Sequence, residues 1–116
     1  MVHASFVYEP AFLHLLDFEA FMGPVINKNA FDKILNYIKH AKDSKKASII
    51  AGGHFDASRG YFIQPTVILT ADPSFKTLKE EIFGPVLTVF LYPDAEYENA
   101  LKDIDASSSY ALTASL

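Results

Sequence analysis

The chain has 116 residues, of which 50% are hydrophobic and 21% charged, the composition of one folded domain. Its formal net charge of −4 has the wrong sign for neutralising phosphates, so nucleic acid is not expected among its partners. The sequence contains no cysteine, which excludes disulfides, thiolate metal sites and a cysteine nucleophile within these residues.

The first twenty residues are apolar and aromatic without a clear period, and Pro10 prevents one continuous helix through them. No run approaches the roughly 18 apolar residues of a membrane span, so no membrane association is expected. Met1 to Ala20 has neither the basic start of a secretory signal nor the arginine content of a mitochondrial presequence. The residues themselves therefore indicate no compartment.

The clearest predicted element is a helix that follows a turn at Gly23-Pro24. Asn29 can cap it, with Asp32 at the third helical position. Lysines such as Lys33 and Lys39 are expected on its solvated face, not in a binding patch. Its apolar residues recur at helical spacing and form one stripe facing the core: Phe31, Ile34, Leu35 and Ile38.

Three apolar runs rich in β-branched and aromatic residues predict strands at Ser48 to Ala51, Tyr61 to Thr70 and Val86 to Tyr92. Pro65 cannot donate a ladder hydrogen bond, so the second strand lies at an edge or is interrupted there. The polar residues His54 to Gly60 are expected to form a connecting loop.

Two further helical segments are expected. A short turn spans Phe75 to Glu80, and a helix follows Pro93-Asp94, with Tyr97, Ala100, Leu101 and Ile104 at helical spacing. Strands that alternate with helices predict an α/β fold with a mixed or parallel sheet and flanking helices, in which helices cover both faces of the sheet.

The chain ends in a loop at Ser107 to Ser109 and an apolar run, Tyr110 to Leu116. Such a run is expected to begin a strand, and a strand seldom finishes a domain because its edge is left unpaired. The expectation is therefore that the chain is a fragment of a larger protein.

Familiar catalytic and metal motifs are not found in the sequence. The four histidines (His3, His14, His40 and His54) have no i, i+3 or i, i+4 pairing, so no metal site is expected. There is no Gly-x-Ser-x-Gly elbow, and Gly52-Gly53 is typical of a strand-ending turn, not of a phosphate loop. Adjacent residues Glu80 and Glu81 would point in different directions and would not form a shared acid/base pair.

One string does carry a specific pattern: Lys79-Glu80-Glu81-Ile82-Phe83-Gly84-Pro85-Val86. It resembles a signature of the NAD(P)-dependent aldehyde dehydrogenases. The order of parts around it is also similar to that family: Gly23 to Ile26, the helix from Ala30, Ala51-Gly52-Gly53, and Gly60 to Thr66.

Within the family, three segments are most similar to the members that oxidise glutamate semialdehyde to glutamate in mitochondrial proline breakdown: Phe21 to Ile26, Tyr92 to Asp94, and Asp105 to Thr113. The resemblance covers residues 18–116 and implies a partial aldehyde dehydrogenase catalytic domain there, with residues 1–17 unmatched. For the parent enzyme it implies NAD as cofactor, an aldehyde substrate, a homo-oligomer and the mitochondrial matrix.

The resemblance also implies roles for two residues. Glu81 would bind the hydroxyls of the nicotinamide ribose, and Phe83 would pack beside the nicotinamide. A carboxylate can accept hydrogen bonds from two vicinal hydroxyls, and an aromatic face can confine a flat ring. Without the motif, Glu81 would be interpreted as a solvated acid and Phe83 as a core residue.

The family's catalytic cysteine, general-base glutamate, oxyanion asparagine and Rossmann cofactor loop would all precede Phe21, and this chain lacks them. No catalytic residue is therefore expected here, and the isolated chain should be inactive, with weak or no NAD binding. Ala111 and Ala114 stand where the family often has glycine, and an added methyl group there could crowd a backbone of positive φ.

Two other interpretations remain open. The chain could be a noncatalytic module that pairs with the full-length enzyme through the apolar edge at Tyr110 to Leu116. It could also be an unrelated soluble α/β domain that carries the motif by chance. The fold distinguishes this last interpretation from the others.

Overall fold

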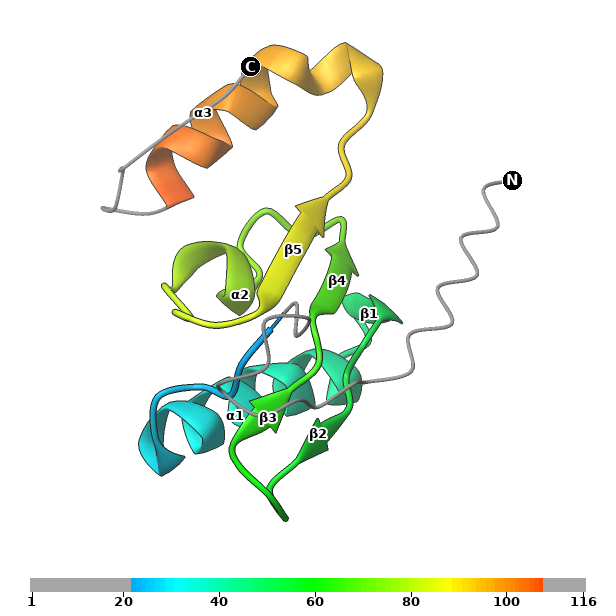
Figure 1. The fold of residues 1–116 in the computed structure, drawn as a ribbon. Coiled ribbons are helices and arrows are strands. Elements are labelled where there is room, and N and C mark those ends of the chain that lie inside the picture. Colours follow the sequence, from blue (N-terminus) through cyan, green and yellow to red (C-terminus); the bar gives the residue numbers. More distant parts are fainter. Residues whose placement is uncertain (1–21, 108–116) are drawn as a thin grey trace.

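The computed structural model describes residues 22–107 of the chain. Its elements, in chain order, are α1 (Lys28–Asp43), β1 (Ala47–Ala51), β2 (Phe55–Asp56), β3 (Phe62–Ile63), β4 (Thr66–Thr70), α2 (Lys76–Lys79), β5 (Val86–Phe90), the 3-10 turn η1 (Asp94–Glu96) and α3 (Tyr97–Ser107). Strands β1, β4 and β5 form one sheet in the order β1-β4-β5, and β2 pairs with β3 (Figure 1).

The three-stranded sheet is mixed, as predicted. Strand β1 runs antiparallel to β4, with Ala47 opposite Thr70 and an irregularity between Ile49 and Ala51. Strand β4 runs parallel to β5, with Thr66 opposite Val86. The parallel pair needs a crossover connection, and α2 lies within it.

Helix α1 confirms the predicted apolar stripe but begins earlier than predicted. The capping residue is Asn27, whose backbone is extended and whose side-chain oxygen accepts a hydrogen bond from the Ala30 amide at 2.9 Å. Asn29 lies inside the first turn, so the predicted cap at Asn29 is wrong, because Asn27 already satisfies a free amide of that turn. The buried residues of the helix are Phe31, Ile34, Tyr37, Ile38 and Ala41.

The predicted strand over residues 61–70 is interrupted at Pro65, which separates β3 from the central strand β4. The loop predicted from His54 to Gly60 is partly wrong because it contains β2. Phe55 of this strand packs edge-on against the Phe31 ring, with ring centroids 5.8 Å apart. The backbone amide of Gln64 donates a hydrogen bond to the His54 carbonyl. The ring contact and the backbone hydrogen bond hold this mostly polar segment against α1 and the chain that follows β3.

The turn at Gly52 explains how β1 leaves the sheet. Gly52 has φ +76°, and a Cβ atom there would lie 2.8 Å from the Pro65 carbonyl carbon and closer still to its oxygen. Only glycine fits this left-handed conformation and close approach. The next amide, that of Gly53, then donates to the Thr66 hydroxyl at 2.9 Å, which fixes the turn against β4.

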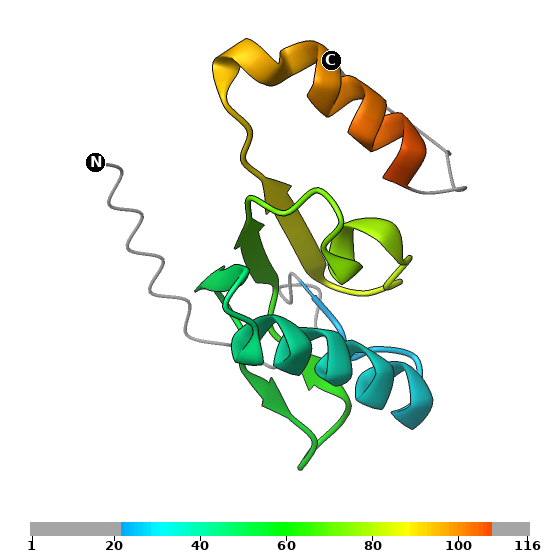
Figure 2. The same cartoon turned by 180° about the vertical axis from the view of Figure 1, so that it is seen from behind.

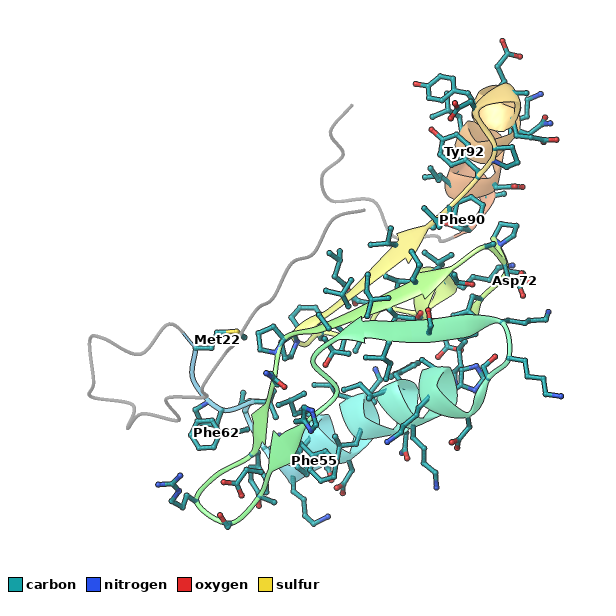
Figure 3. All side chains as sticks on the ribbon, turned by 90° about the vertical axis from the view of Figure 1, so that its right-hand side faces the viewer. Met22, Phe55, Phe62, Asp72, Phe90 and Tyr92 are labelled. Carbon is teal, nitrogen blue, oxygen red and sulfur yellow. The ribbon has the colours of Figure 1, made fainter. Side chains whose placement is uncertain are left out.

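Helices α1 and α2 cover the same face of the sheet, which Figure 2 shows from the side of α1. Ile34 of α1 and Ile68 of β4 are fully buried on this face, and Phe75 before α2 packs beside Ile68. Among residues 22–107 no helix covers the opposite face of the sheet (Figure 3). Ile50 of β1 and Leu87 of β5 are 58% and 61% exposed. The expectation of helices on both faces is thus wrong for the described part of the chain, because the two helices that pack on the sheet share one face.

After β5 the chain leaves the sheet. The strand ends at Phe90, two residues earlier than predicted, although the Leu91 amide still donates to the Thr70 carbonyl. Helix α3 confirms the predicted helix and extends it to Ser107, which was predicted to lie in a loop. The Ser107 hydroxyl donates to the Ile104 carbonyl at 2.7 Å. This helix lies beyond the carboxyl end of β5, apart from the other helices (Figures 1 and 2).

The predictions for Tyr110 to Leu116, including those on Ala111 and Ala114, fall outside the described residues, as do those for residues 1–21. Within residues 22–107, no helix has the length and apolar character needed to cross a membrane.

Candidate functional site

The signature string forms the end of α2, an irregular segment and the start of β5. We call residues 80–85 the motif loop. Ile82 is buried in the core cluster that includes Ile34 and Tyr37, whereas Glu81 and Phe83 on either side of it are exposed. Within this short segment the central side chain is therefore in the core, and the side chains on both sides of it are open to solvent.

Phe83 combines two unusual properties. Its backbone has φ +53°, in the left-handed region that side-chain-bearing residues seldom adopt. Its aromatic side chain is 86% exposed. Such a conformation costs on the order of 1–3 kcal/mol and persists only where neighbouring residues fix it. Phe83 is therefore not a core residue, and its ring is available to a flat ligand.

Gly84 is the neighbour that fixes the loop on the carboxyl side of Phe83. A Cβ atom at this position would lie 2.9 Å from Ile34 Cγ1 and closer still to Cδ1, so the loop backbone lies directly against α1. The Val86 amide donates to the Gly84 carbonyl at 2.7 Å. The turn into β5 is thereby set by backbone packing.

Glu81 presents a carboxylate that no hydrogen bond or ion pair engages among residues 22–107. Its backbone is anchored instead: the Lys33 ammonium of α1 donates to the Glu81 carbonyl over 3.5 Å. An ionised carboxylate accepts hydrogen bonds but donates none, which suits it to a pair of neighbouring hydroxyl groups. The arrangement is compatible with the ribose role that the resemblance implies for Glu81.

Glu80 faces α1, unlike Glu81. The Tyr37 hydroxyl donates to the Glu80 carboxylate at 2.5 Å, and this hydrogen bond, together with burial, raises the pKa of Tyr37 above its usual value. The Lys76 ammonium lies 5.0 Å from the centroid of the Tyr37 ring. The two adjacent carboxylates thus have different surroundings: that of Glu80 accepts a hydrogen bond from Tyr37, whereas that of Glu81 has no partner among residues 22–107.

The sequence missed Tyr37 as a contact of the motif loop. The signal was present, because a tyrosine beside Ile34 and Ile38 in a buried stripe needs a hydrogen-bond partner for its hydroxyl. The partner itself could not be predicted from the sequence, because Glu80 is 43 residues away in the chain.

Two cavities of the described structure lie away from the motif loop. One of about 380 Å³ is bounded by α2, β5 and α3, with Leu78, Phe90 and Ile104 in its lining. A smaller one adjoins Leu91 and Pro93. Neither includes Glu81 or Phe83, whose side chains are both exposed.

The histidines and acidic residues do not gather into a metal site in the described residues, where no three such side chains could share an ion. The His40 ring packs against Phe75 with centroids 5.3 Å apart. His3 and His14 lie outside the described residues.

A scan against protein-family models matches residues 11–116 to the aldehyde dehydrogenase family. The chain belongs to this family. It is 52% identical over 100 residues to the mitochondrial Δ1-pyrroline-5-carboxylate dehydrogenase of Dictyostelium discoideum, and 47% identical over 100 residues to that of Danio rerio. Each match covers 86% of this chain and 18% of the relative, so the chain spans less than a fifth of their length.

Solved structures agree with the sequence relatives. The Δ-pyrroline-5-carboxylate dehydrogenase of Mycobacterium tuberculosis bound with NAD is 41% identical with a TM-score of 0.69, over 80% of this chain and 16% of that one. The same enzyme bound with NAD and cobalamin is 42% identical with a TM-score of 0.73, over 83% and 18%. The fold is that of the aldehyde dehydrogenase catalytic domain, and the interpretation as an unrelated domain is wrong.

Proposed function

We propose that this chain supplies the nicotinamide end of the active site in an NAD-dependent dehydrogenase that oxidises glutamate semialdehyde to glutamate. The observation that carries the proposal is the motif loop, which presents Glu81 and a strained, exposed Phe83 while burying Ile82 between them. The similarity to pyrroline-5-carboxylate dehydrogenases, one of them crystallised with NAD, supports the choice of substrate and cofactor.

The two side chains would have separate roles toward the cofactor. NAD, when bound, supplies the acceptor for a hydride from the substrate. The Glu81 carboxylate accepts hydrogen bonds from the ribose hydroxyls, which fixes the position of the sugar. The Phe83 ring limits the orientations open to the nicotinamide, so that fewer unproductive geometries are populated.

The chain alone is expected to be inactive. Oxidation by this family begins with attack of a thiolate on the aldehyde, and these 116 residues include no cysteine. One ribose contact contributes about 1–3 kcal/mol, less than the roughly 4 kcal/mol that millimolar affinity requires. Glu81 without the remaining cofactor contacts is therefore too weak a site to retain NAD.

For the whole protein we propose that residues 18–116 form part of the catalytic domain and that the enzyme is a homo-oligomer in the mitochondrial matrix. The relatives named above as mitochondrial support this compartment. The sheet face that is open in residues 22–107 supports a partial domain, because Ile50 and Leu87 would be buried once further elements cover them.

The test uses a chimera in which this chain replaces the matched segment of the Dictyostelium enzyme. The chimera should reduce NAD in the presence of glutamate semialdehyde, whereas the free chain should form no NADH. Glu81→Gln in the chimera should raise the KM for NAD about tenfold, the size expected for one charge-assisted hydrogen bond. The matched control is Glu98→Gln, a change at an exposed glutamate of α3.

Two results would contradict the proposal. One is a KM for NAD that stays the same in Glu81→Gln. The other is sustained NADH formation by the free chain, since that would require chemistry without a thiol.

A further inference from the structure

Helix α1 contacts the motif loop through three side chains that lie on one side of the helix. Lys33 donates to the Glu81 carbonyl, Ile34 lies against Gly84, and Tyr37 donates to the Glu80 carboxylate. Positions four residues apart on a helix lie one above the other. The helix thus contacts the first two residues of the loop and, further along, Gly84.

Of the three contacts, the hydrogen bond from Tyr37 to Glu80 is the shortest and therefore depends most on geometry. Its ring is 7% exposed and packs among Ile34, Ile38 and Ile82, so its position is set by the core. Its hydroxyl reaches out of that core to Glu80, the residue that ends α2 and whose amide donates to the Lys76 carbonyl. A donor held in the core therefore meets an acceptor on the exposed first residue of the loop.

Moving Glu80 moves the residues that follow it. The peptide units that join Glu80 to Phe83 are planar, so each residue between them has only two backbone angles that rotate easily. A shift of the Glu80 backbone is therefore passed on to Glu81 and Phe83. Ile82 restrains the depth of the loop through apolar contacts, which are not directional. The hydrogen bond from Tyr37 adds a directional restraint at the first residue of the loop, beside the one that the Lys33 ammonium makes to the Glu81 carbonyl.

We infer that Tyr37 is a positioning residue for cofactor binding: its hydrogen bond to Glu80 sets the orientation of the loop that presents Glu81 and Phe83 to the nicotinamide riboside. The inference rests on the proposed function of Glu81. Tyr37 itself lies in the core and does not touch the cofactor.

The first test uses the purified 116-residue chain and needs no cofactor. Tyr37→Phe keeps the ring and removes the hydroxyl, so the amides of Glu80 and Val86 at the two ends of the loop should exchange with solvent about three- to tenfold faster. The matched control is Tyr61→Phe, because Tyr61 packs against Phe31 in the same cluster, away from Glu80. Equal exchange in the wild type and Tyr37→Phe would overturn the inference.

The second test measures kinetics in the chimera. Tyr37→Phe should raise the KM for NAD about three- to tenfold and leave the KM for the aldehyde within about twofold, a split that general destabilisation would not produce. Glu80→Ala should have the same effect, the double variant should be no worse than either single variant, and Glu80→Gln, which retains an acceptor oxygen, should recover part of the loss.

The outcomes separate the two proposals. If Glu81→Gln raises the KM for NAD and Tyr37→Phe does not, the positioning role is refuted and the proposed function stands. If neither variant changes it, the proposed function fails as well. If the losses from Tyr37→Phe and Glu80→Ala add in the double variant, the two residues act independently, which also refutes the positioning role.

Discussion

Gly84→Ala tests the contact between the motif loop and α1. The added Cβ would lie 2.9 Å from Ile34 Cγ1 and closer to Cδ1, and Ile34 is fully buried, so its side chain cannot turn into solvent. Overpacking of this kind costs about 1–3 kcal/mol, and the smaller entropy of the unfolded alanine chain offsets about 0.4–1 kcal/mol of that. We expect Gly84→Ala to lower the free energy of unfolding by about 1–2 kcal/mol, measured by urea denaturation followed by circular dichroism.

A double-mutant cycle isolates the cause. Ile34→Val removes Cδ1, the atom nearest to the new methyl group, and costs about 0.5–1.5 kcal/mol alone. The double variant should lose about 1 kcal/mol less free energy of unfolding than the sum of the two single variants, because removing Cδ1 partly relieves the clash. Strictly additive losses, or a neutral Gly84→Ala, would refute the reasoning that these two residues are in direct steric contact.

Three further predictions concern stability. Asn27→Ala should cost about 1 kcal/mol through loss of the helix cap, whereas Asn29→Ala should change the free energy of unfolding by less than about 0.5 kcal/mol; equal losses would contradict the observed cap. The hydrogen bond from Lys46 holds the pKa of Asp72 at about 2, below the ordinary 3.8, so this stabilisation is present above pH 3.8 and is lost as the pH falls through about 2; the acid dependence should be weaker in Asp72→Asn. The raised pKa of Tyr37, whose ordinary value is 10.0, gives stabilisation that is present below pH 10.0 and is lost as the pH rises through the folded-state pKa; Tyr37→Phe should therefore lose less stability than the wild type on going to alkaline pH.

Local patterns were sufficient for much of the fold. The apolar stripe of α1 and the spacing of α3 predicted both helices because helical periodicity persists over several turns. Pro65 predicted either an edge strand or an interruption, because a proline cannot donate within a ladder, and the structure shows the interruption. The strands were predicted from β-branched runs that alternate with helices, a pattern that left the sheet either mixed or parallel, and the structure shows the mixed form.

Long-range contacts explain most of what local patterns missed. Strand β2 forms in a polar segment because Phe55 packs on a ring of α1. The bond between Tyr37 and Glu80 joins residues 43 positions apart. The cap was misplaced for a local reason, since two asparagines stand two positions apart and only the backbone conformation distinguishes them.

The site residues were found through the signature string and not through pattern alone. Exposure of Phe83 runs against the usual preference of phenylalanine for the interior, and a positive φ at this position is not readable from the sequence. Sequence reasoning identified the motif but could not show that its backbone turns the phenylalanine outward.

The most direct test of the central claim is a crystal structure of the chimera with NAD bound. The Glu81 carboxylate is expected within hydrogen-bond distance of both hydroxyls of the nicotinamide ribose, with the Phe83 ring in van der Waals contact with the nicotinamide. Density that places the nicotinamide riboside away from the motif loop, with Glu81 still solvated, would contradict the account.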